Sequence, residues 1–154
     1  MRILLPLLIL AAAAAAAGPI QPREGWATHD SDKGYDALLA DLKAAVEAED
    51  MAVVTEAGPT EAAASRGVEI PGNRVVGVFR NDFAVRALEA SAPAMIEAPI
   101  RFYVVEDPEG GSQLAWKRPS HVFAPYADTG GEALAEVAAE LDAIFEAIGQ
   151  RALE

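Results

Sequence analysis

The chain has 154 residues, with 12 Lys and Arg against 24 Asp and Glu and no cysteine, so its formal net charge is −12 at pH 7. This excess of negative charge argues against binding nucleic acid or an anionic membrane surface, because both repel an acidic protein. The absence of cysteine excludes disulfide scaffolds, thiol nucleophiles, Cys-ligated zinc and the cysteine-linked lipid anchor of bacterial lipoproteins.

Residues 1–17 have the layout of a secretory signal peptide. Met1 and Arg2 form a short positive start, an apolar stretch begins at Ile3, and an alanine run ends at Ala17. We expect cleavage before Gly18, which places the mature protein in the periplasm or outside the cell with no stable membrane insertion. Retention as an anchor is the alternative, although the apolar stretch spans at most 15 residues and a spanning helix needs about 20.

The rest of the chain is long enough for one domain. Removing 17 residues from 154 leaves 137, and single domains cluster at about 100–150 residues. We expect an N-terminal linker at 18–24, one folded domain at 25–149 and a C-terminal tail at 150–154.

Apolar spacing and turn residues divide this domain into strands and helices. Apolar side chains recur at helical spacing from Tyr35 to Val46, after the candidate N-caps Asp30, Ser31 and Asp32. The sequence further predicts strands at 25–29, 51–55, 74–79, 100–106 and 113–117 and helices at 60–65, closed by Gly67, and at 83–90.

The end of the chain contains the clearest patterns. A short turn rich in Pro, Gly and Asp separates the last two strands, which predicts a β-hairpin. Apolar side chains recur at helical spacing from Leu134 to Ile148, and Thr129 with Glu132 has capping-box spacing. Short connections and the hairpin favour a two-layer α+β fold, in which helices pack on one face of a mostly antiparallel sheet of about five strands. The strand at 113–117 is expected at the sheet edge, where pairing with a second copy would give a homodimer.

Several segments follow one another in an order that matches a known family. They are Leu42-Lys43-Ala44-Ala45-Val46, the strand Val75–Phe79 with Arg80-Asn81-Asp82, Ala92-Pro93, Ala98-Pro99-Ile100-Arg101-Phe102-Tyr103-Val104, and Glu106-Asp107-Pro108-Glu109-Gly110 leading to Leu114–Pro119. In these segments the chain resembles a bacterial family known as domain of unknown function 302. The family's usual Phe-Gly-Asn-Pro is replaced by Phe79-Arg80-Asn81-Asp82, and Trp116 takes the aromatic position of its Tyr-x-x-Pro run. The resemblance covers about residues 25–148 and implies a compact two-layer α+β fold with no assigned reaction.

Few residues are candidates for chemistry. His29 and His121, with Asp30 or Asp128, would make a metal site only if the fold brought them together, because no short His-x-x-x-His spacing is present. Ser120 lies beside His121 but lacks the Gly-x-Ser-x-Gly frame of serine hydrolases, and no phosphate-binding glycine motif is present. The sequence therefore predicts no catalytic residue, no metal site and no cofactor.

The candidate ligand-binding residues follow two of the predicted strands. Arg80 and Asn81 follow the central strand, next to Asp82. The second group lies at the end of the hairpin and after it, next to Lys117, and consists of Trp116, Arg118, His121 and Tyr126. We expect both groups at one end of the sheet, where Lys117 and Arg118 form a basic spot that can attract a small anion or an acidic partner. The alternative is structural: Asn81 and Asp82 cap a helix, and Trp116 and Tyr126 fill the edge of the core.

Two functions from different classes remain. The favoured one is a non-enzymatic exported domain that binds an unidentified small ligand or envelope protein and can form a homodimer. The other is an enzyme, or a metal- or haem-associated redox accessory protein, that uses His29 or His121. They differ in whether either imidazole faces a concave, partly apolar pocket with a second ligand in reach.

Overall fold

The computed structural model describes residues 19–154. The expected signal peptide and its cleavage point lie outside the described residues. Within residues 19–154, no helix combines the length and apolar character that crossing a membrane requires.

The described residues form five strands and five α-helices. The strands are β1 (Trp26–Ser31), β2 (Ala52–Ala57), β3 (Asn73–Phe79), β4 (Ile100–Glu106) and β5 (Ser112–Lys117). The α-helices are α1 (Tyr35–Ala48), α2 (Thr60–Ala64), α3 (Asn81–Ala90), α4 (Pro119–Phe123) and α5 (Ala127–Leu153), and two 3-10 turns, η1 (Ala92–Glu97) and η2 (Ala124–Tyr126), complete the set.

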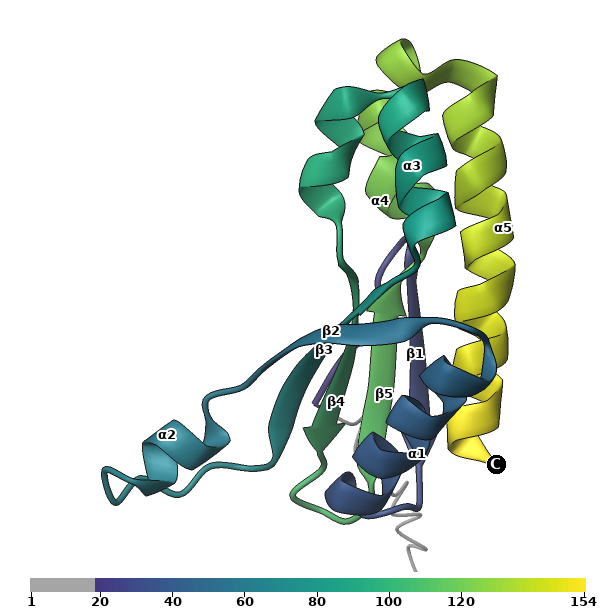
Figure 1. The fold of residues 1–154 in the computed structure, drawn as a ribbon. Coiled ribbons are helices and arrows are strands. Elements are labelled where there is room, and N and C mark those ends of the chain that lie inside the picture. The colour runs from purple at the N-terminus through teal and green to yellow at the C-terminus, as the bar shows by residue number, and fades with distance from the viewer. Residues whose placement is uncertain (1–18) are drawn as a thin grey trace, which may run out of the picture.

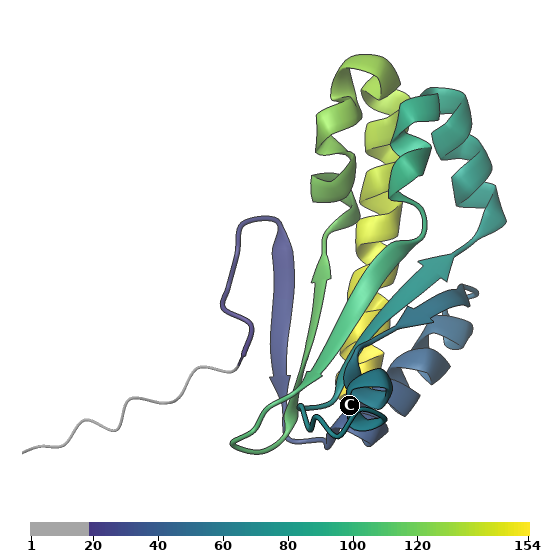
Figure 2. The ribbon, with the colours of Figure 1, turned by 90° about the vertical axis from the view of Figure 1, so that its left-hand side faces the viewer.

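All five strands form one antiparallel sheet in the order β1-β5-β4-β3-β2 (Figure 1). The helices α1 and α5 lie along one face of this sheet, and α3 and α4 pack against α5 beyond the ends of the strands. The predicted α+β fold is therefore confirmed. Figure 2 looks onto the opposite face of the sheet, with α5 behind the strands and the arm that carries α2 projecting toward the viewer. We call this face uncovered, because α1 and α5 both lie on the other one.

One expectation about the sheet is wrong, because β5 is not an edge strand. It lies between β4 and β1, and the edges of the sheet are β1 and β2. The first strand of the domain, β1, pairs with the side of β5 that faces away from β4, with Trp26 opposite Lys117 and Ser31 opposite Ser112. This pairing joins segments far apart in the sequence, and no local pattern specifies it.

The core lies between the sheet and α5. The apolar face predicted for the last helix is buried, and the ring of Phe145 stacks on that of Phe102 with 4.7 Å between centroids. Phe102 in turn packs at a tilt against Trp116, with 5.4 Å between centroids. Burial of each such side chain stabilises the fold by about 1.5–3 kcal/mol, so this aromatic cluster fixes α5 on the sheet.

Two of the expected helix caps do not form. The N-cap of α1 is Gly34 and no side-chain cap forms there, because β1 continues through Ser31. Thr129 lies inside the first turns of α5, where its hydroxyl donates to the Tyr126 carbonyl, so the expected capping box does not form. The helix instead kinks at Gly131, whose φ of 51° lies in the left-handed region that glycine tolerates.

Candidate functional site

Side chains on the uncovered face of the sheet lie in rows across the strands. Trp26 pairs with Lys117. Phe102 pairs with Trp116, and extending this β4–β5 register by one residue places Arg101 opposite Lys117. We call Trp26, Lys117 and Arg101 the cationic row.

The neighbouring row on the same face is apolar. Ala115 pairs with Tyr103, and Tyr103 pairs with Val75 of β3. These three residues form the apolar row. It lies two residues along each strand from the cationic row, which corresponds to about 6–7 Å.

A groove with a volume of about 550 Å³ lies over the two rows. This volume falls in the range of about 300–1,000 Å³ that is typical of small-molecule sites. We call it the sheet groove. The residues that line it are Trp26, Asn73, Val75, Glu97, Ile100, Arg101, Phe102, Tyr103, Ala115, Trp116, Lys117 and Val122.

The sheet groove lies in the basic region of an acidic protein. The chain has 12 Lys and Arg, of which Arg2 is outside the described residues. Six of the described ones form ion pairs with carboxylates. Within residues 19–154 the cations without such a partner are Arg23, Arg66, Arg101, Lys117 and Arg118.

Four of these five cations gather around Trp26. The Arg23 guanidinium carbon and the Lys117 ammonium each lie 5.7 Å from the centroid of its ring. Arg118 lines a smaller pocket together with Trp26, and Arg101 stands beside Lys117 in the cationic row. The fifth, Arg66, follows α2 on the arm that projects from the sheet (Figure 1). Positive charge without an ion-pair partner is therefore concentrated around Trp26, at one side of the groove.

Hydrogen bonds fix the polar residues around the apolar row. The side-chain amide of Asn73 donates to the hydroxyl of Tyr103. Gln113 is buried, and its amide group donates to Asp30 and also binds the backbone of Ile20: the Ile20 N–H donates to Gln113 Oε1 at 2.7 Å. These bonds tie the segment before β1 to the sheet, and Figure 2 shows that segment folded back beside β1.

The structure places the hairpin group of candidate residues near one end of the groove. Trp116 is buried in the core and stacks on His29 with 5.2 Å between ring centroids. The exposed Arg118 donates its backbone N–H to the Gly25 carbonyl at 2.9 Å. The Tyr126 hydroxyl donates to the groove residue Glu97 at 2.7 Å, and this hydrogen bond raises the pKa of Tyr126.

Arg80 and Asn81 lie elsewhere. Asn81 is the exposed first residue of α3. The Arg80 guanidinium lies 4.3 Å from the ring centroid of Phe83 and donates to Asp82 at 2.8 Å, which lowers the pKa of Asp82. Arg80 and Arg118 line different pockets, so the structure does not bring the two groups of candidate residues together.

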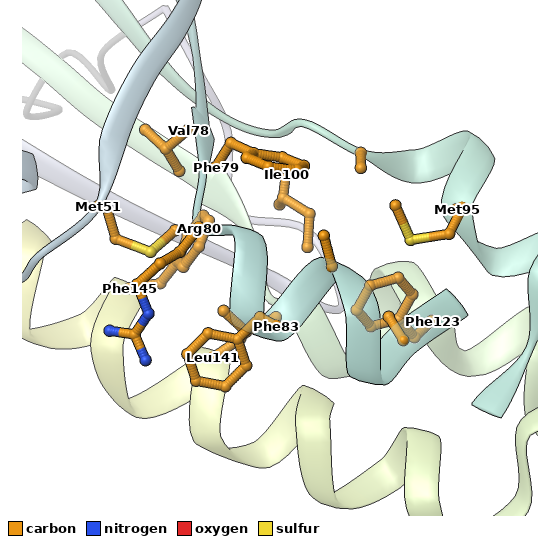
Figure 3. A pocket seen from close by; sticks show the side chains of 13 residues that line it. Met51, Val78, Phe79, Arg80, Phe83, Met95, Ile100, Phe123, Leu141 and Phe145 are labelled. Atoms are coloured by element: carbon orange, nitrogen blue, oxygen red, sulfur yellow. The ribbon is translucent and has the colours of Figure 1, made fainter. Parts of the chain in front are cut away.

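The pocket beside Arg80 is apolar and small. Figure 3 shows Phe83, Leu141 and Phe145 among the side chains around it. Its volume of about 40 Å³ is room for roughly two or three water molecules. This pocket is a packing gap between α3, α5 and the sheet, and it is too small for an organic ligand.

The two histidines contact different partners. His29 stacks on Trp116. The ring of His121 lies against Gly25, so closely that a Cβ added to that glycine would overlap it. Within residues 19–154, no group of three or more His, Asp or Glu side chains is arranged to hold a metal ion.

Sequence reasoning missed Trp26, Arg101 and Tyr103 as candidates for the site. A signal was present in β4, where Arg101 and Tyr103 alternate with the buried Ile100, Phe102 and Val104. Such alternation indicates that one face of the strand is buried and the other is not. It does not indicate that the second face is hollow.

Comparison with known proteins places the chain in a family. A model described as "Domain of unknown function DUF302" matches residues 27–148. A crystal structure of an uncharacterized conserved DUF302 protein from Bacillus stearothermophilus is similar in fold, with a TM-score of 0.73 and 19% identity over 84% of this chain and 98% of that chain. The search of curated proteins found no match. Since the family model matches most of the chain, the protein belongs to the DUF302 family, whose function is unknown.

Proposed function

We propose that this protein is an exported, non-enzymatic binding domain that holds a small organic ligand in the sheet groove. The observation that carries the proposal is the hollow on the uncovered face, with a volume of about 550 Å³ and with both aromatic and cationic side chains in its lining. Apolar walls with a few polar groups that orient the ligand are the usual composition of small-molecule sites.

The lining residues favour binding over catalysis. General acid–base chemistry needs a titratable side chain that can reach the substrate and release or accept a proton near neutral pH. Among the described residues that line the groove, Glu97 is the only carboxylate and there is no histidine. Glu97 accepts the hydrogen bond from Tyr126, so one of its oxygens is already engaged.

Export is the second part of the proposal, and its support is the N-terminal sequence. Residues 1–17 combine a positive start, an apolar stretch and a small-residue end. A domain without cysteine is suited to an oxidising compartment, because it offers no thiol that could pair wrongly. The ligand is then a molecule of the bacterial envelope or its surroundings.

Native mass spectrometry of protein purified from the periplasm of its host tests both parts. We expect an intact mass that starts at Gly18 and a small molecule bound noncovalently. Val75→Trp places a large side chain in the groove and should remove that molecule. Val54→Trp is the matched control, because Val54 is a strand valine that is 49% exposed and lies outside the groove lining. Wild-type protein without a bound molecule, or a molecule that Val75→Trp retains, would contradict the proposal.

A further inference from the structure

We infer that the ligand of the sheet groove is an organic oxyanion with an apolar body. Its acidic group lies between Arg101 and Lys117, and its body lies over Tyr103 and Val75. This inference rests on the proposed function and adds the chemical class of the ligand.

The first argument is the charge of the cationic row. Arg101 and Lys117 are exposed and both line the groove, one residue beyond the last β4–β5 pair, with no carboxylate paired to either within residues 19–154. Like charges in opposite positions on neighbouring strands destabilise a sheet. A carboxylate or phosphate between them removes this repulsion, and the guanidinium can donate two parallel N–H groups to it.

The second argument is that Lys117 is held in place without being neutralised. The Lys117 ammonium lies over the ring of Trp26, and Arg23 lies at the same distance from that ring. Attraction to an aromatic face restrains a cation but leaves its charge in place. Binding an anion here therefore costs less conformational entropy than binding it between freely moving side chains.

The third argument concerns the rest of the ligand. The apolar row begins about 6–7 Å from the cationic row, which is roughly the length of one aromatic ring. The Tyr103 ring is held by the hydrogen bond from Asn73 to its hydroxyl, and the half-buried Val75 lies opposite it on β3. Glu97 also lines the groove, and its negative charge disfavours a second acidic group. The ligand is thus acidic at one end and apolar over the rest.

Three probes separate the contributions of charge and body. The anion 2-naphthoate has both, 2-naphthylmethanol has the same body without charge, and inorganic phosphate has charge without a body. We would measure dissociation constants by calorimetry at low ionic strength and map each probe by amide chemical shifts of the full chain. We expect 2-naphthoate to bind about tenfold more tightly than the alcohol, as a charge-assisted hydrogen bond allows, and more tightly than phosphate.

Substitutions then locate the charge. Arg101→Gln with Lys117→Gln should abolish the preference for naphthoate over the alcohol. Arg66→Gln is the matched control, because it removes an equally unpaired, exposed cation on the arm that carries α2, and it should leave the preference unchanged. All three side chains are exposed, so we expect the melting temperatures of these variants to stay near that of the wild type.

The outcomes separate the inference from the proposed function. If both naphthyl probes shift the groove amides with equal affinity, the inference is overturned and the proposed function remains. If neither probe shifts these amides, both are contradicted. If phosphate binds as tightly as naphthoate, the claim that the ligand has an apolar body is overturned. A dimer in sedimentation that Arg101→Gln with Lys117→Gln dissociates would assign this face to a second copy of the chain and overturn the inference.

Discussion

Replacing Gly149 of α5 with alanine tests how closely the last helix packs on the sheet. A Cβ at this position would lie 2.3 Å from Cη2 of Trp116, closer than carbon atoms can approach. The indole has little room to move, because it is only 2% exposed and is flanked by Phe102 and His29. Overpacking of this kind costs about 1–3 kcal/mol, and the better helix propensity of alanine offsets about 1 kcal/mol of that cost. We expect Gly149→Ala to lower the free energy of unfolding by about 1 kcal/mol.

Denaturant unfolding followed by tryptophan fluorescence measures this change. Ala143→Gly is the control, because Ala143 is exposed in the same helix and its substitution reports helix propensity alone, at a loss of about 1 kcal/mol. If propensity alone governed position 149, Gly149→Ala would stabilise the protein by a similar amount. A Gly149→Ala variant more stable than the wild type, beside a destabilised Ala143→Gly, would refute the packing argument.

Three further outcomes are expected. Arg86 donates two hydrogen bonds to Glu140, and they lower the pKa of that carboxyl. The ion pair therefore stabilises the fold at pH values above the ordinary pKa of a glutamate, and this stabilisation is lost as the pH falls through the lowered pKa. Glu140→Gln should then show a smaller drop in melting temperature than the wild type between neutral pH and about pH 3. Gln113→Ala removes the side chain that holds the segment before β1, so amide hydrogen exchange at residues 19–24 should become faster. The free energy of unfolding should fall by about 1–3 kcal/mol. Unchanged exchange would contradict this expectation. Gly25→Ala should destabilise the protein for two reasons, its φ of 74° and the overlap of the new Cβ with His121. In a double-mutant cycle followed by thermal melts, His121→Ala should restore only the stability lost to the overlap.

Local periodicity was sufficient to predict the last helix. The apolar side chains from Leu134 to Ile148 recur at the spacing of one helix face, and that face is the one buried against the sheet. The N-cap of α1 was not predictable in the same way. Ser31 has the chemistry of an N-cap, but its backbone pairs with Ser112, and this long-range pairing overrides the local preference.

The candidate site was predictable only in part, for a related reason. The basic character of Lys117 and Arg118 is visible in the sequence because the two residues are adjacent. The proximity of Trp26 and Arg101 to Lys117 depends on the order of three strands, of which β1 comes from a distant part of the chain. Arg80 follows its strand as expected, but it lies on the opposite side of the sheet, in the core-side pocket beside Phe83.

The separation of charge between the two faces makes the domain an electric dipole. The exposed side of α5 carries Asp128, Glu132 and Glu136, whereas unpaired cations surround Trp26 on the far side of the sheet. On a positively charged matrix the molecule will therefore adsorb through its helical layer. Immobilised in that way, it presents the groove to the solution without any chemical tag.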